Sequence, residues 1–331
     1  MPKILVTGAA GFIGFHVAQR LLAAGHRVVG FDAMTDYYDP ALKRARLAML
    51  TSQESFCFVQ DLLETPGRLT ELFAAEEFDA VIHLAAQAGV RYSLDAPRSY
   101  ASSNVVGTLE LLEAARQTPP AHLLMASTSS VYGLNTEMPY AETQKADAQA
   151  SLYAATKKAN EAMGHSYAHL FGLPTTMFRF FTVYGPWGRP DMALFKFVKA
   201  MLEDRPIEIY NHGQMMRDFT FIDDIAEAIV ALVDARPETG RAGEAGHISP
   251  APFRVVNIGN QEPVKLMDFV KALESTLGIE AKKKFLPMQP GDVPATWADT
   301  GLLHELTGLT PRTSIEDGVA AFVEWYRTHY A

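Results

Sequence analysis

The sequence predicts an α/β fold, a doubly wound parallel sheet with a smaller mixed α/β C-terminal lobe. Over the first 180 residues short apolar segments alternate with longer segments of helical periodicity, and a glycine-rich turn follows the first apolar segment. Continuously apolar strands separated by helices belong to a parallel sheet that is covered on both faces. The expected strands are 3–7, 27–32, 56–59, 80–85, 122–127 and 174–180, and the expected amphipathic helices include 12–24, 98–117 and 151–171.

After residue 180 the alternation loosens. Pro and Gly interrupt "YGPWGRPD", and a polar, Gly-rich stretch at 237–247 precedes a helical C-terminus. We therefore expect a first domain over 1–180, to which parts of 218–258 return, and a second lobe mainly over 181–331.

Composition excludes several classes of protein. The 331 residues have a formal charge of −9, with 38 acidic and 29 basic residues and no long run of either sign, which disfavours a nucleic-acid or anionic-membrane surface. The single Cys57 cannot form an internal disulfide, and no segment approaches 18 uninterrupted apolar residues. Because "MPKILVTG" leads directly into a strand, we expect a cytoplasmic protein. No cluster has convincing metal-ligand spacing, so no metal is expected.

The stretch "VTGAAGFIG" places Gly8, Gly11 and Gly14 between the first strand and the first helix. Such a turn brings the backbone close to a pyrophosphate at a helix N-terminus. Asp32 ends the second strand 18 residues after Gly14, where its carboxylate can accept hydrogen bonds from both ribose hydroxyls and repel a 2′-phosphate. NAD is therefore predicted over NADP; a tight turn and a solvated Asp is the alternative. The residues predicted to form the cofactor site are Gly8, Gly11, Phe12, Ile13, Gly14, Asp32, Asp61, Leu62, Ala85, Ala86, Asn104, Tyr153 and Lys157.

Some residues near this site have two interpretations. Asp61 after the third strand can meet the adenine amino group or cap the next helix. Ala85 and Ala86 are small enough to let the backbone pass under the nicotinamide ribose. His83 lies in a buried segment and is predicted to be a core histidine rather than a catalyst or ligand.

The predicted catalytic groups follow the fifth strand. Thr128, Ser129 and Ser130 are three adjacent hydroxyls, which can orient oxygens but are poor acids and bases near neutral pH. Tyr153 and Lys157 are four residues apart on a helix and share one face, so the ammonium is expected to lower the pKa of the phenol.

These motifs resemble those of the extended short-chain dehydrogenase/reductase family. Thr128, Tyr153 and Lys157 match the family's catalytic positions, and Asn104 in "SSNVVGTLE" matches its structural Asn. Nearly the full length is similar to nucleoside-diphosphate-sugar epimerases, and most to UDP-glucuronate 4-epimerases. The stretches that show this are "DAMTDYYDPALKRARL", "RFFTVYGPWGRPDMALFKF", "RDFTFIDDIAEAI", "RVVNIG", "LPMQPGDV" and "SIEDGVAAFVEWYR".

The resemblance implies a tightly held NAD, a 4-keto sugar intermediate and a homodimer formed through a four-helix bundle. It also implies a UDP-sugar site in which the hydroxyls and arginines hold the substrate, with Asp292 accepting from the nucleoside ribose. Each arginine alone could equally be a surface ion pair, and Ser129 and Ser130 could simply satisfy backbone groups at the strand end. The predicted substrate-binding residues are Arg91, Thr128, Ser129, Ser130, Thr182, Arg189, Arg217 and Asp292.

Related activities remain as alternatives. Sugar-nucleotide 4,6-dehydratases carry an Asp-Glu pair in the hydroxyl run, which is absent here, and UDP-galactose 4-epimerases typically have an Asn at the position of Thr182. A UDP-glucuronate decarboxylase that forms UDP-xylose and a UDP-glucose 4-epimerase are the closest alternatives. A non-catalytic NAD-sensing protein would have no reason to keep Tyr153 and Lys157.

Overall fold

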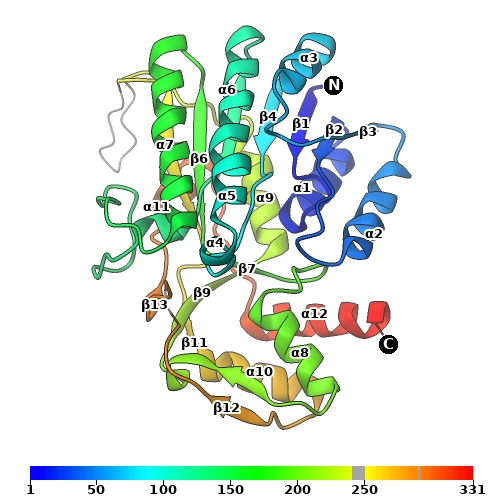
Figure 1. The fold of residues 1–331 in the computed structure, drawn as a ribbon, viewed down its shortest axis with the longest axis vertical. Helices are drawn as coiled ribbons and strands as arrows, with labels where there is room; N and C mark the ends of the chain where they lie inside the picture. Colours follow the sequence, from blue (N-terminus) through cyan, green and yellow to red (C-terminus); the bar gives the residue numbers. More distant parts are fainter. Residues whose placement is uncertain (241–249, 290, 331) are drawn as a thin grey trace.

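A seven-stranded parallel sheet with helices on both faces forms the larger part of the molecule, and a smaller lobe lies beneath it in Figure 1. The computed structural model describes residues 1–240, 250–289 and 291–330. The strand order is β10-β6-β5-β4-β1-β2-β3, and every neighbouring pair is parallel. The predicted fold class is confirmed. The strands are β1 (Lys3–Thr7), β2 (Arg27–Asp32), β3 (Phe56–Gln60), β4 (Ala80–His83), β5 (His122–Ala126), β6 (Thr175–Phe180) and β10 (Phe253–Ile258).

Two apolar cores bury the two faces of this sheet. Side chains of α1 (Phe12–Ala23), α2 (Pro40–Thr51) and α9 (Ile222–Leu232) belong to one core. Side chains of α3 (Arg68–Glu76), α6 (Gly107–Gln117) and α7 (Leu152–Phe171) belong to the other. Both sets of sheet side chains leave water in this arrangement, which explains why the strands are apolar throughout.

The helix expected over 98–117 differs from the prediction. The chain forms two short helices, α4 (Tyr92–Asp95) and α5 (Pro97–Tyr100), then a π-helical turn, η1 (Ala101–Val106), and only then α6. The wider turn contains the buried Asn104, whose side chain bonds to Gln87 of the segment after β4. A single turn of π-helix of this kind is frequent at functional sites.

The strands on either side of this region end earlier than predicted. β4 ends at His83 and β5 at Ala126, and a short 3₁₀ turn, η2 (Ser129–Tyr132), follows β5. Residues 84–90 and 128–130 therefore lie beyond the strand ends and are available to line a site.

The smaller lobe is built around β9 (Met216–Phe221), which pairs with three short strands. Phe219 of β9 stacks on Phe269 with the ring centroids 4.6 Å apart, and this pair lies in the lobe's core. β10 then returns the chain to the main sheet beside β6. Of the Gly-rich stretch, residues 241–247 lie outside the described residues. The remaining elements are β7 (Thr182–Tyr184), α8 (Ala193–Leu202), β8 (Ile207–Ile209), η3 (Tyr210–Gly213), β11 (Pro263–Lys265), α10 (Leu266–Leu277), β12 (Lys283–Phe285), β13 (Ala295–Thr296), α11 (Gly301–Thr307) and α12 (Ile315–Tyr330).

Candidate active site

A cavity of about 1190 Å³ lies between the carboxyl ends of the main strands and the smaller lobe. Its walls include the residues that directly follow β1, β2, β4, β5 and β6, the edge at which doubly wound sheets bind ligands. The structure brings every predicted site residue except Asn104 to this one cavity. Those lining residues are Gly8, Gly11, Phe12, Ile13, Gly14, Asp32, Asp61, Leu62, Ala85, Ala86, Arg91, Thr128, Ser129, Ser130, Tyr153, Lys157, Thr182, Arg189, Arg217 and Asp292.

The glycine turn fits a pyrophosphate. A Cβ added to Gly14 would lie 2.0 Å from the carbonyl oxygen of Gly8, and Gly8 itself has a φ of +73°. The Gly11 amide donates to the same oxygen at 2.9 Å, which closes the turn. No side chain caps α1 at Gly11, so the helix N-terminus can receive an anion.

Asp32 lies beside this turn with its side chain almost fully buried. Its Oδ1 accepts from the Met34 amide at 2.8 Å and its Oδ2 from the Ala10 amide at 3.1 Å. Each carboxylate oxygen keeps a further lone pair, so the group can still accept from two ribose hydroxyls. Lys43 of α2 also lines the cavity here; its Nζ donates to the Thr35 carbonyl at 2.8 Å. Sequence reasoning missed Lys43, although it lies within a stretch that carried the family resemblance.

Asp61 accepts hydrogen bonds from residues of its own turn and also lines the cavity. Its Oδ1 accepts from the Leu62 amide at 2.8 Å and from the Thr65 hydroxyl at 2.9 Å, and these hydrogen bonds lower the pKa of the carboxyl. Because α3 begins only at Arg68, with Gly67 as its N-cap, Asp61 does not cap that helix.

Asn104 lies behind the cavity wall. Its Oδ1 accepts from the Gln87 amide at 2.8 Å, and its Nδ2 donates to the Gln87 carbonyl and to the Thr156 hydroxyl, each at 3.1 Å. Thr156 precedes Lys157 on α7, so Asn104 joins the segment after β4 to the catalytic helix. Asn104 was predicted to contact the cofactor. In the structure it does not line the cavity and instead supports two segments of the wall through its hydrogen bonds.

His83 is a core residue in this fold. Its Nδ1 lies 2.8 Å from the Thr7 hydroxyl, and burial lowers its pKa to about 3, so the ring is neutral at physiological pH. The segment after it passes close under the turn, since a Cβ on Gly8 would lie 2.8 Å from the Ala85 amide nitrogen. Among the described residues, no group of three or more His, Cys, Asp and Glu side chains is placed to hold a metal ion.

Tyr153, Thr128 and Lys157 meet where the cofactor and substrate ends of the cavity join. Lys157 Nζ donates to the Ala126 carbonyl at 3.0 Å. Burial raises the pKa of Tyr153, while the positive charge of Arg189 and the Thr128 hydroxyl act in the opposite direction. The expected lowering of the pKa of Tyr153 is not seen in the protein chain itself, because burial outweighs the groups that favour the phenolate. Burial also lowers the pKa of Lys157 to about 8.

Three predicted arginines line the cavity, each with a protein partner. Arg189 donates to the Asp191 carboxylate from Nε at 3.0 Å and from Nη2 at 2.5 Å. Arg217 donates to the carbonyls of the 293–294 segment, and Arg91 pairs with Asp292 at 3.4 Å. Arg91 was predicted to bind the substrate and Asp292 to accept from its ribose, and the structure places these two side chains against each other.

Further cations of the smaller lobe line the cavity, and sequence reasoning missed them, although Lys196 lies within a stretch that carried the family resemblance. In a protein with a formal charge of −9, this local positive charge suits an anionic ligand. These cations are Lys196, Lys199, Arg205 and Lys284.

The three hydroxyls after β5 form part of the cavity wall. Thr128 caps η2, accepting from the Ser130 amide at 3.2 Å and donating to the Ser130 hydroxyl at 3.2 Å. Thr182, at the start of β7, lines the cavity as well. The wall formed by this hydroxyl run therefore offers hydrogen bonds without a carboxylate.

Comparison with known proteins agrees with this geometry. Residues 4–259 match the NAD dependent epimerase/dehydratase family. This chain belongs to that family. It is 53% identical to a probable UDP-glucuronate 4-epimerase of Rhizobium meliloti (strain 1021), over 99% of this chain and 98% of that protein. It is 47% identical to UDP-glucuronate 4-epimerase 4 of Arabidopsis thaliana, over 99% of this chain and 76% of that protein.

A solved structure is also similar over the full length. The UDP-glucuronic acid 4-epimerase of Bacillus cereus, in complex with UDP-glucuronic acid and NAD, superposes with a TM-score of 0.90 at 35% identity, covering 99% of this chain and 100% of that one. The resemblance predicted from the motifs is confirmed. None of the described helices is long and apolar enough to cross a membrane.

Proposed function

We propose that this protein is an NAD-dependent UDP-glucuronate 4-epimerase, which interconverts UDP-glucuronate and UDP-galacturonate through a transient 4-keto sugar. One observation carries the proposal. A single cavity joins a dinucleotide turn, the Tyr153, Lys157 and Thr128 group, and a wall of hydroxyls with no acid among them. The volume exceeds that of an ordinary single-ligand pocket, which suits a cofactor and a nucleotide sugar together.

The residues present fit NAD at the glycine-turn end, with Gly8, Gly11 and Gly14 at the pyrophosphate and Asp32 at the ribose. Bound there, NAD would accept a hydride from C4 of the sugar and return it. Tyr153 as phenolate takes the proton of the 4-hydroxyl, and Thr128 hydrogen-bonds the same oxygen. Lys157 would bind the nicotinamide ribose, and its ammonium would stabilise the phenolate against the effect of burial. Because hydride removed from one face must return to the other, the 4-keto sugar has to turn while its diphosphate stays bound by the arginines.

The hydroxyls have a further task with a uronic acid. A 4-keto uronic acid is a β-keto acid, which can lose carbon dioxide when its carboxylate C–C bond aligns with the carbonyl π system. Hydrogen bonds from Ser129, Ser130, Thr128 and Thr182 would hold the C6 carboxylate away from that alignment. If they do, Ser129→Ala combined with Thr182→Val should release a 4-keto pentose that the wild type does not, and its absence from the variant would refute this role.

The function is tested by proton NMR of UDP-glucuronate with the purified protein and no added NAD, with UDP-glucose in a parallel tube. UDP-galacturonate in the first tube alone is the expected result, and it would also show that NAD is retained. UDP-xylose would identify a decarboxylase, and turnover of UDP-glucose alone a neutral-sugar epimerase. No turnover of either despite bound NAD would point to a sensing protein.

We also propose a homodimer formed through α6 and α7, which lie side by side in Figure 1. Large apolar side chains remain exposed on and beside these helices, as a buried interface would need. They are Val106, Leu109, Leu152, Leu170 and Phe171. A monomer mass by light scattering at micromolar concentration would exclude this dimer. The cytoplasmic location stays a prediction that cell fractionation tests.

A further inference from the structure

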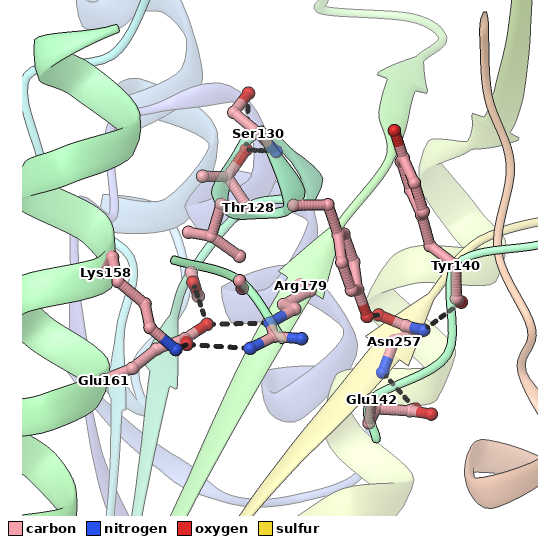
Figure 2. A network of polar contacts seen from close by, with 12 residues as sticks. Thr128, Ser130, Tyr140, Glu142, Lys158, Glu161, Arg179 and Asn257 are labelled. Carbon is pink, nitrogen blue, oxygen red and sulfur yellow. Dashed lines mark hydrogen bonds and ion pairs between the residues drawn. The ribbon is translucent and has the colours of Figure 1, made fainter. Parts of the chain in front are cut away.

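A buried ion pair lies behind the hydroxyl run, outside the active-site cavity. Figure 2 shows Glu161 of α7 facing Arg179 of β6. Arg179 Nε donates to Glu161 Oε1 at 2.8 Å and Nη2 donates to Oε2 at 2.9 Å, and both side chains are at most 4% exposed. Lys158 reaches Oε2 from the solvent side at 3.1 Å. None of the reaction steps proposed above uses this pair.

The carboxylate of the pair connects to the beginning of the hydroxyl run. The Ser127 hydroxyl donates to Glu161 Oε1 at 2.7 Å, and the Ser127 amide donates to the Phe178 carbonyl of β6 at 2.6 Å. Ser127 directly precedes Thr128, whose extended backbone and side chain start η2. Glu161 lies four residues after Lys157 on the same helix, so one carboxylate joins the catalytic helix to the strand end that carries Thr128.

The guanidinium of the pair connects to the far end of the run. Arg179 lies over the ring of Tyr132, the last residue of η2, with its Cζ 4.6 Å from the ring centroid. The Tyr132 hydroxyl donates to Asn257 Oδ1 at 2.7 Å. The other face of Tyr132 stacks on Tyr140, a cavity-lining residue, at 4.4 Å. Ser129 and Ser130 therefore lie between two residues that the same ion pair holds.

The pair is fixed in charge and shape. Burial alone would raise the pKa of the Glu161 carboxyl, but its hydrogen bonds and charge interaction with Arg179 outweigh burial and leave the pKa below its usual value. Buried ion pairs are weak sources of net stability, because desolvation offsets the attraction. Their bidentate geometry is strongly directional, however, and that is the property an orienting device needs.

We propose that the Glu161–Arg179 pair is a positioning device that sets the geometry of the Thr128–Ser130 hydroxyls and thereby the preference of the site for a sugar bearing a C6 carboxylate. This inference rests on the proposed function, since it assigns the hydroxyls to that carboxylate. Neither residue of the pair lines the active-site cavity, so the pair acts through Ser127 and Tyr132.

The test compares the dissociation constants of UDP-glucuronate and UDP-xylose, which lacks the carboxylate, measured by calorimetry on the NAD-loaded protein. Arg179→Lys keeps the positive charge but loses the bidentate hydrogen bonding to Glu161 and the planar stacking on the Tyr132 ring. Ser127→Ala leaves the ion pair intact and removes only the hydrogen bond from the Ser127 hydroxyl to Glu161. This variant should therefore fold even if Arg179→Lys does not. Lys158→Met is the matched control, because it removes an ion pair from the same carboxylate on the side away from the run.

Arg179→Lys is expected to weaken UDP-glucuronate binding by about tenfold and Ser127→Ala by about fivefold, the size of one lost or misplaced hydrogen bond. UDP-xylose binding should change less than about twofold in both, and Lys158→Met should change neither sugar. Activity assays should show the same loss as a raised KM for UDP-glucuronate, whereas a purely structural role would lower the melting temperature and weaken both sugars alike.

Equal weakening of both sugars, or no change with Ser127→Ala, would overturn the inference. So would a wild-type protein that binds the two sugars equally, because there would be no preference to set. Failure of the proposed function is a separate result: the wild type would yield no UDP-galacturonate, while the ratio of dissociation constants, which needs no turnover, still decides the role of the pair.

Discussion

Replacing Gly14 with Ala should disable the cofactor turn while leaving most of the fold intact. The new Cβ would lie 2.0 Å from the Gly8 oxygen and 2.7 Å from the Gly8 carbonyl carbon, whereas real Cβ contacts essentially never fall below 3.0 Å. The turn would have to open by at least the 1.0 Å difference between 3.0 and 2.0 Å. Gly8 cannot easily move, because its amide donates to the Phe31 carbonyl at 2.7 Å and its oxygen accepts from Gly11.

Overpacking of this kind costs about 1–3 kcal/mol, and here the displaced atoms are those predicted to hold the pyrophosphate. NAD affinity should therefore fall by about 5- to 150-fold, measured by calorimetry on protein freed of NAD. Gly164→Ala is the matched control. It lies within α7, where a Cβ would meet nothing nearer than 3.5 Å, so it should leave NAD binding unchanged and gain up to about 1 kcal/mol of helix stability. A Gly14→Ala protein that binds NAD like the wild type would refute the reasoning.

Three further predictions follow from charge and burial. Because the pKa of Lys157 is lowered to about 8, its ammonium should be lost above pH 8 and kcat should decline there; a flat profile to pH 10 would contradict this. Between pH 8 and 10.5, Lys157 is protonated in the unfolded chain but largely neutral in the folded protein. The unfolding free energy of the wild type should therefore rise by about 3 kcal/mol across that window, compared with Lys157→Met, as measured in urea titrations. Arg189→Gln should shift the acid limb of the kcat/KM profile to higher pH, since the Arg189 charge opposes the raised pKa of Tyr153, and an unmoved limb would exclude that influence. Burial lowers the pKa of His83 to about 3 and of His122 to about 4. The unfolding free energy should therefore fall as the pH drops below 6.5, by about 1.4 kcal/mol per pH unit for each histidine. His122→Gln should remove one of the two contributions, and an unchanged pH slope in this variant would contradict the prediction.

Local patterns were sufficient to predict six of the seven strands of the main sheet, all except β10. The six predicted strands all exist, with their ends displaced by up to two residues, because a strand buried on both faces has an unmistakable apolar composition. The prediction was less accurate at the 98–117 helix. A π-helical turn has no compositional signature, and this one is accompanied by hydrogen bonds from Asn104 to a segment 17 residues earlier.

The residues of the candidate site also fall into two groups, those that the sequence could predict and those that it could not. The glycine turn, Asp32, the hydroxyl run and the Tyr153–Lys157 pair could be found because each depends on a short stretch whose geometry is fixed by backbone sterics or by helical spacing. Lys43 and the cations of the smaller lobe were missed, because lysines and arginines are usually solvated and only the fold shows which of them reach the cavity.

The sequence by itself therefore determined six strands of the sheet, the cofactor turn and the identity of the reacting groups. The tertiary structure alone decided how those groups are tuned and held. It places Arg189 near Tyr153, sets Arg91 against Asp292 across 201 residues of chain, and buries Glu161 with Arg179 behind the hydroxyls. Charge interactions and burial depend on distances through space, and these distances are fixed only when segments remote in sequence pack together.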